Sequence, residues 1–176
     1  MVAYSSVARD DALRLFDALQ NLYAATYAES PYREGPEQVA RFRAGLPDEV
    51  TRLGFSLVTA NDGALLVGAA YGWTMPTGTW WSRADQDPSP EVLDADKFAV
   101  MEWMVHPGHR GQGIGADLMS KLLAGRPEKY ATLASNPASA ARLMYERAGW
   151  QQAATSVLPW GPTMDLLVLP LRGSAT

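Results

Sequence analysis

The chain of 176 residues contains no cysteine. It can therefore form no disulfide, bind no metal through thiolates and use no cysteine nucleophile in covalent catalysis. Histidine is almost as scarce, because His106 and His109 are the only two, and they stand on either side of a Pro-Gly pair. Two histidines in one exposed turn are too isolated for a metal site, so we expect no metal and two solvated imidazoles, of which His109 could help to bind phosphate.

Long hydrophobic runs and an excess of positive charge are also missing. The longest apolar stretch, ALLVGAAYGW, is too short to cross a bilayer, and the first residues, MVAYSSVARDD, contain no apolar h-region. We expect no signal peptide, no membrane span and, with no disulfides to form, a cytoplasmic location. Lys and Arg number 15 against 19 Asp and Glu, a net charge of −4, which argues against nucleic acid as a partner.

What is present is the composition of an ordinary globular protein. Hydrophobic residues make up 47% of the chain and charged residues 19%, and the length suits one domain with a buried core. No internal repeat or low-complexity tract interrupts it. We therefore expect a single domain over residues 1–176.

Hydrophobic periodicity and turn residues predict the elements of the N-terminal half. These are a strand over 2–7, a helix capped by Asp10 or Asp11 that fades before Pro31, a second helix over 37–53 that Gly45 and Pro47 can split, and a hairpin of strands 55–60 and 64–74 turning at Asn61–Gly63. The segment around Tyr27, Tyr32 and Arg33 is expected to shape an acceptor pocket.

The second half continues the alternation of strands and helices. We expect a long loop over 75–96, strands over 98–105, 130–134, 150–158 and 164–171, and helices over 113–124 and 137–148. Ala116, Met119, Leu122 and Leu123 should face the sheet from the first of these helices. The alternation predicts an α/β fold with a mixed sheet.

The long loop carries two tryptophans among acidic residues. Trp80 and Trp81 stand near five carboxylates, a combination that could receive a cationic amine between rings and charges. In the alternative interpretation the tryptophans fold back onto the core and the carboxylates are solvated. The sequence leaves both open.

Residues 98–116, FAVMEWMVHPGHRGQGIGA, contain the most informative pattern. An apolar strand runs into a turn with Arg110, Gly111, Gly113 and Gly115, and then directly into a helix. A helix start presents unpaired N–H groups and the positive end of its dipole, so this junction predicts an anion site.

Three kinds of phosphate loop have related patterns. A Walker loop is excluded because Ile114 and Gly115 stand where Lys and Ser or Thr should follow. The dinucleotide fingerprint fits badly, since the strand stops several residues before the first glycine and the region 131–135 is neutral where a ribose-binding acid is needed. The remaining pattern, Arg or Gln, two residues, Gly, one residue, Gly or Ala, is satisfied by Arg110, Gly113 and Gly115.

A second motif follows at a suitable separation. A short strand leads to Ser135, Asn136 and Pro137, then to AARLMYERAGW with Tyr145 and a Gly-aromatic ending. With both motifs in this order, residues 97–151 resemble the GNAT superfamily of N-acetyltransferases, although Trp150 stands where the family usually has Phe. The resemblance implies a single-domain GNAT-like fold, a mixed central sheet flanked by helices, and acetyl transfer from acetyl-CoA directly to a primary amine.

The resemblance also implies which residues bind the coenzyme. The backbone of Met104 and Val105 is expected to bond the pantetheine arm, and Asn136 its amides. The pyrophosphate is expected on the amides of Gly111, Gln112, Gly113, Ile114, Gly115 and Ala116, with Arg110 beside them. Asn136 also stands where it could cap a helix whose first residue is Pro137, and both roles can hold.

Two residues are candidates for proton transfer. In the family motif the phenol at Tyr145 protonates the departing thiolate. Glu102 is a lone carboxylate in a strand that is apolar on both faces, where desolvation would raise its pKa and suit a general base. The alternative is a structural carboxylate paired with an arginine. Ala99 replaces an acidic residue that is common in the family three places earlier.

The acceptor is not specified by these motifs. A polyamine, an amino sugar, an amino acid and a protein N-terminus remain open, and the acidic loop favours a small cationic molecule. The rival hypothesis is a catalytically silent acyl-CoA sensor or scaffold. The residues do not determine the oligomeric state; acetyltransferases of this type are often dimers, which leaves a homodimer open.

Overall fold

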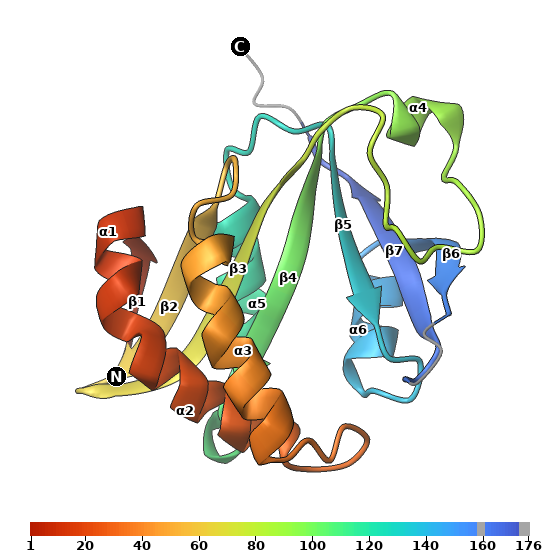
Figure 1. The fold of residues 1–176 in the computed structure, drawn as a ribbon. Helices are drawn as coiled ribbons and strands as arrows, with labels where there is room; N and C mark the ends of the chain where they lie inside the picture. The colour runs from red at the N-terminus through yellow and green to blue at the C-terminus, as the bar shows by residue number, and fades with distance from the viewer. Residues whose placement is uncertain (158–160, 173–176) are drawn as a thin grey trace. The chain divides into compact units, whose positions relative to one another are not determined.

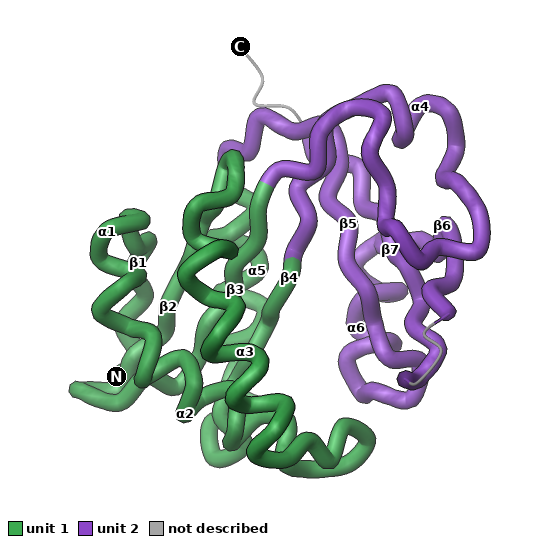
Figure 2. Tube along the Cα trace, viewed as in Figure 1, with its two compact units in different colours: residues 1–73, 101–124 green, residues 74–100, 125–176 purple. Residues whose placement is uncertain are grey.

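The computed structural model describes residues 1–157 and 161–172. Its seven strands form a mixed sheet in the order β1-β2-β3-β4-β5-β7-β6, with helices flanking it (Figure 1). The chain divides into two compact units, residues 1–73 with 101–124, and residues 74–100 with 125–176 (Figure 2). We call them unit 1 and unit 2. The expected α/β class is confirmed.

The elements lie close to their predicted ranges. Unit 1 contains β1 (Val2–Val7), α1 (Arg9–Ala12), the 3-10 turn Leu13–Leu15, α2 (Phe16–Tyr27), α3 (Pro36–Glu49), β2 (Ser56–Asp62) and α5 (Ile114–Leu123), with most of β3 (Leu65–Met75) and the second half of β4 (Lys97–Val105). Unit 2 contains α4 (Pro90–Leu93), β5 (Tyr130–Ser135), α6 (Ala141–Arg147), β6 (Gln151–Ser156) and β7 (Met164–Pro170), with the rest of β3 and β4.

Unit 1 is a sheet covered on both faces. β1, β2 and β3 pair antiparallel, and the predicted hairpin turns at Gly63, whose φ is 59°. Side chains of α2 and α3 bury one face together with residues of β2, β3 and β4. α5 packs on the opposite face, where a Cβ at Gly68 would lie 2.8 Å from Leu118. Glycine is needed there because helix and strand approach so closely.

Three details of unit 1 differ from the sequence expectation. Ala8, and not Asp10 or Asp11, precedes α1, and both aspartates lie in its first turn, where they complement the helix dipole. α3 runs through Gly45 and Pro47 without a break, because its apolar stripe is packed against the core.

The third difference concerns the buried face of α5. Ile114, Leu118 and Leu122 are buried, whereas Ala116 is exposed and Met119 and Leu123 are only partly buried. The predicted stripe was wrong at Ala116 because the helix begins at Ile114, whose bulky side chain takes the first core position.

Unit 2 is built around β5 and β7. Lys97–Ala99 of β4 pair in parallel with Tyr130–Thr132, while β7 pairs antiparallel with both β5 and β6. The side chain of Lys97 is fully buried, and its Nζ donates to three carbonyl oxygens, those of Val92, Leu93 and Ala95, at 2.6–3.3 Å. This ammonium group fixes the end of the preceding loop.

The loop over 75–96 supports the structural interpretation of its tryptophans. Trp81 Nε1 donates to Thr132 Oγ1 at 2.9 Å, and Trp80 packs against a cluster that includes Val92 and Tyr130. Asp96 accepts from the Thr77 N–H at 2.8 Å. The two rings therefore fold onto unit 2, in agreement with the second interpretation, and do not form the aromatic site for an amine that the first interpretation offered. The loop also contains the short helix α4, which the sequence did not predict because its residues show no sustained hydrophobic period.

The C-terminal expectations are met in part. Gly149 ends α6 in the left-handed region at a φ of 91°, and strands follow over 151–156 and 164–170. Residues 158–160, on which part of the predicted connection falls, lie outside the described residues. No helix in the described ranges is both long enough and apolar enough to cross a membrane.

Candidate acetyl-CoA and active site

The glycine turn after β4 uses two backbone conformations that favour glycine. Gly111 (φ 75°) and Gly113 (φ 81°) lie in the left-handed region, and Gly113 directly precedes α5. The first backbone hydrogen bond of α5 runs from the Asp117 N–H to the Gly113 oxygen at 3.1 Å. The N–H groups of residues 114–116 precede this bond and share the positive end of the helix dipole. This helix start can therefore bind an anion.

Gly115 lacks a side chain for a different reason. A Cβ there would lie 2.9 Å from Trp103 Cζ2, and Trp103 Nε1 donates to the Gly115 carbonyl oxygen at 2.8 Å. The indole on β4 thus packs on the first turn of α5 and fixes its position. The sequence pattern identified the glycine but not the tryptophan that requires it.

Arg110 is already engaged by the end of α2. Its Nη1 lies 3.0 Å from Glu29 Oε2, and its Nη2 donates to the Thr26 carbonyl oxygen at 3.2 Å. A cation at a helix C-terminus is favourable because the last carbonyl groups have no helical partner. A phosphate that binds this guanidinium would have to compete with Glu29.

The other predicted coenzyme residues of unit 1, which were assigned through their backbone groups, have side chains that differ in exposure. The side chain of Met104 is buried in the core, and Ile114 is buried at the start of α5. Val105 is partly buried at the end of β4, after which the His106 N–H donates to the Val67 oxygen at 2.8 Å. Gln112 and Ala116 are exposed.

The two histidines are less solvated than expected. His106 Nδ1 accepts from the Gly108 N–H at 3.1 Å. His109 Nε2 lies 3.6 Å from Asp62 Oδ2, and its Nδ1 is buried. Both imidazoles therefore brace the turn. No group of three or more His, Asp or Glu side chains in the described part of the chain is placed to hold a metal ion.

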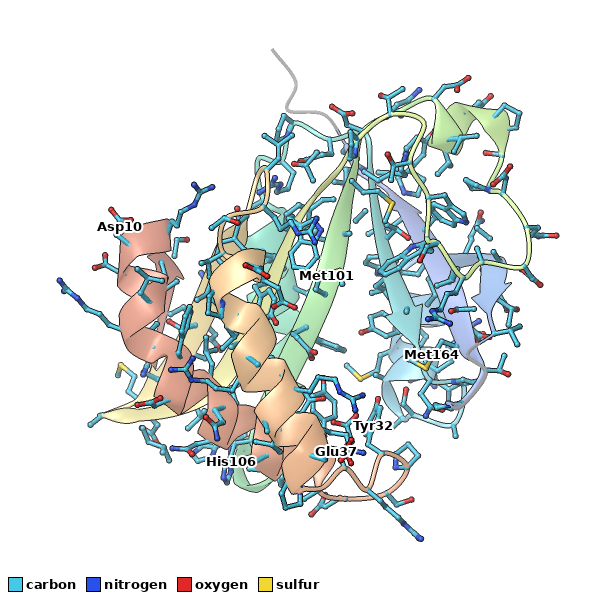
Figure 3. The ribbon with its side chains drawn as sticks, in the orientation of Figure 1. Asp10, Tyr32, Glu37, Met101, His106 and Met164 are labelled. Atoms are coloured by element: carbon cyan, nitrogen blue, oxygen red, sulfur yellow. The ribbon has the colours of Figure 1, made fainter. Side chains whose placement is uncertain are left out.

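Glu102 lies on β4 immediately after Met101, which Figure 3 labels. Its Oε2 accepts a hydrogen bond from the hydroxyl of Tyr27 at 2.7 Å. Burial raises the pKa of Glu102 to about 8, the Tyr27 hydrogen bond opposes this rise, and the charges of Glu49 and Glu34 add to it. A tyrosine, and not the arginine of the structural alternative, is thus the partner of this carboxylate.

Two further tyrosine–glutamate pairs lie in unit 1. Tyr71 donates to Glu49 Oε2 at 2.7 Å, and Tyr23 donates to Glu34. The sequence had assigned Tyr27 to an acceptor pocket and had not singled out Glu34 or Glu49. The four-residue spacing of Tyr23 and Tyr27, which places them on one face of α2, was the available signal.

Asn136 and Tyr145 lie in unit 2. Asn136 Oδ1 accepts from the Ala138 N–H at 2.9 Å, and the Ser139 N–H donates to the Asn136 carbonyl oxygen at 3.0 Å. The predicted capping of a helix that begins at Pro137 is wrong, because these two bonds close a turn and α6 begins only at Ala141, after Ala140. The Tyr145 side chain is buried, and its ring meets that of Trp150 edge-on at 5.7 Å. All other predicted site residues belong to unit 1.

A cavity of about 320 Å³ opens elsewhere in unit 1. It lies between α2, the start of β3 and His106, with Asn21, Ala25 and Leu65 in its lining. None of the predicted catalytic or coenzyme residues lines it.

The fold and the site define a class of α/β proteins in which a central strand leads, through a glycine turn, to the start of a helix that can bind an anion. The family model of the acetyltransferase (GNAT) domain matches residues 57–152, more than half of the chain. The protein belongs to the GNAT family of acetyltransferases. This membership confirms the expected class of enzyme, an N-acetyltransferase.

Solved structures of GNAT proteins share the fold over nearly the whole chain. PaiA N-acetyltransferase from Thermoplasma acidophilum, in complex with coenzyme A, is 12% identical with a TM-score of 0.60, covering 97% of this chain and 99% of that one. An aminoglycoside 6′-acetyltransferase type Ii is 15% identical with a TM-score of 0.67, covering 98% and 99%. The ribosomal-protein-S18-alanine N-acetyltransferase from Escherichia coli is 15% identical with a TM-score of 0.62, covering 99% and 97%. No curated protein matches the sequence.

Proposed function

We propose that this protein is an acetyl-CoA-dependent N-acetyltransferase, formed by one GNAT domain over residues 1–176, that transfers acetyl directly to a primary amine. The observation that carries the proposal is the start of α5, where three N–H groups follow two left-handed glycines. A diphosphate is the group that such a helix start binds well. Family membership and the coenzyme A bound to PaiA support acetyl-CoA as its source.

The coenzyme contacts that we propose are mostly to the backbone. The diphosphate binds the N–H groups of residues 111–116, with Arg110 beside them, and the pantetheine lies along Met104 and Val105 like an added strand. Asn136 Oδ1 already accepts from Ala138, so its amide N–H₂ is the group that donates to the pantetheine.

Glu102 and Tyr145 perform the proton transfers in this proposal. Glu102 takes a proton from the ammonium acceptor, directly or through water, because its raised pKa suits a base near neutral pH. The neutral amine forms the new C–N bond as the thioester C–S bond breaks. Tyr145 then donates its proton to the thiolate, and the phenolate regains a proton from the acylated nitrogen, which becomes the neutral amide.

We propose a small cationic molecule as the acceptor. The loop over 75–96 no longer supports this choice, since its tryptophans are turned inward. Support comes from unit 1, where Glu34 and Glu49 each act on the pKa of Glu102 through charge. We place the enzyme in the cytoplasm because the chain lacks cysteine, and we propose a homodimer on the family resemblance alone.

A thiol-release assay with acetyl-CoA and a panel of amines tests the function. Tyr145→Phe should lower kcat about a hundredfold or more while coenzyme A still binds, because the phenol proton acts only as the C–S bond breaks. Tyr130→Phe removes a hydroxyl from another buried tyrosine of unit 2 and serves as the control.

Two results would contradict the proposal. Coenzyme A binding without turnover on any amine, in the wild type as well as in Tyr145→Phe, would favour the silent sensor. Calorimetry that detects no coenzyme A binding to the folded protein would remove the site itself.

A further inference from the structure

The hydroxyl of Tyr27 is the only hydrogen-bond partner of Glu102 within residues 1–157 and 161–172. It donates to Oε2 at 2.7 Å, so that Oε2 is occupied and Oε1 makes no hydrogen bond within those residues. Tyr27 is the last residue of α2, a helix held to the core by the buried side chains of Leu19 and Leu22. The core therefore determines where this hydroxyl lies.

The ring of Tyr27 is held between two other aromatic rings. Tyr23 meets it at a centroid distance of 4.7 Å and an interplanar angle of 60°, and Tyr32 at 4.9 Å and 77°. Tyr32, labelled in Figure 3, comes from the connection between α2 and α3. Edge-to-face contacts from both neighbours restrict the rotation of the phenol.

We propose that Tyr27 is a positioning residue for Glu102. The Tyr27 hydroxyl holds Oε2 of Glu102 and leaves Oε1 as the oxygen that takes the proton from the acceptor. The inference rests on the role of Glu102 in the proposed function. Tyr27 touches neither the acceptor nor the coenzyme in this scheme and acts only through the carboxylate.

The charges around Glu102 explain why such a residue is needed. Burial and the carboxylates of Glu34 and Glu49 favour the protonated acid, and the hydrogen bond from Tyr27 favours the carboxylate. Tyr23 and Tyr71, the other titratable groups coupled to Glu102, have raised pKa values and stay neutral. The pKa of Tyr27 is also raised well above its usual value, so Tyr27 remains a donor throughout the working range.

The titration of Glu102 can be observed directly by NMR of protein labelled with ¹³C at the glutamate carboxyl carbon. The Glu102 signal is identified by its loss in Glu102→Gln. We expect a midpoint near 8 in the wild type and a midpoint higher by about one to two pH units in Tyr27→Phe, because a hydrogen bond to a charged group is lost. An unchanged or lowered midpoint would overturn the proposal.

Tyr71→Phe is the matched control. It removes an equivalent hydrogen bond of 2.7 Å, but one made to Glu49. Weaker ionisation of Glu49 reduces the repulsion on Glu102, so the Glu102 midpoint should stay in place or fall. A rise as large as that in Tyr27→Phe would show that any tyrosine of the cluster has this effect, and would overturn the specific role of Tyr27.

A second variant covers the case in which Tyr27→Phe does not fold. 3-Fluorotyrosine at position 27 keeps the shape of the ring and makes the hydroxyl a stronger donor, so the Glu102 midpoint should fall. No shift would contradict the proposal. These titrations need neither coenzyme nor acceptor, and their outcome is therefore separate from the thiol-release assay that tests the proposed function.

Discussion

Replacing Glu102 with glutamine should make the protein less sensitive to alkaline pH. Burial raises the pKa of Glu102 from 4.5 to about 8 in the folded protein, so folding favours the protonated acid. Its contribution to stability is fully present below the unfolded pKa and is lost as the pH rises through the folded pKa. Glutamine resembles the protonated acid in shape and stays neutral.

The size of the effect follows from the two pKa values. A difference of 3.5 units between 8 and 4.5, at about 1.4 kcal/mol per unit, corresponds to about 5 kcal/mol for complete titration. Up to about 3 kcal/mol of this falls between about pH 6 and about pH 9, which would appear as a relative shift in melting temperature of about 5 to 10 °C.

Urea unfolding of the wild type and Glu102→Gln at these two pH values measures the difference. Other groups with shifted pKa values, such as Glu49 and Glu128, are present in both proteins and largely cancel. The wild type should lose more stability than the variant between the lower and the higher pH. If both lose the same amount, Glu102 titrates with an ordinary pKa and the argument for a buried base fails.

Three further substitutions test other parts of the structure. Lys97→Met should lower the free energy of unfolding by about 2 to 3 kcal/mol in urea, because three carbonyl groups lose their donor; a neutral result would contradict that role. Gly115→Ala should weaken coenzyme A binding about tenfold by calorimetry, since its Cβ would displace Trp103, and unchanged affinity would show that the helix start tolerates the shift. Glu29→Gln should change that affinity by less than about fivefold, because its ion pair with Arg110 is exposed; a larger gain would show that Glu29 competes strongly with the diphosphate for the guanidinium.

The sequence predicted the order of the elements well because hydrophobic period and turn residues act locally. The hairpin at Gly63 and the end of α6 at Gly149 both depend on backbone conformations that glycine favours. The continuity of α3 through Pro47 could not be predicted in this way. It depends on packing against residues that are distant in the sequence.

The candidate site shows the same difference between local sequence signals and contacts that depend on tertiary packing. The glycine pattern predicted the helix start, and the apolar strand predicted that the pKa of Glu102 is raised. The partner of Glu102 is 75 residues away, and Glu29 is 81 residues from Arg110. Contacts over such separations are made by tertiary packing, and a single sequence carries no local signal for them.

The neighbouring positions 102 and 103 of β4 point in opposite directions. Glu102 meets Tyr27 of α2, whereas Trp103 meets the first turn of α5. Because side chains alternate along a strand, a slip of one residue would exchange the two environments. The alignment of β4 thus determines where the Glu102 carboxylate lies and where α5, the helix proposed to bind the nucleotide end of the coenzyme, begins. A variant that shifts β4 should therefore impair proton transfer and coenzyme binding at once.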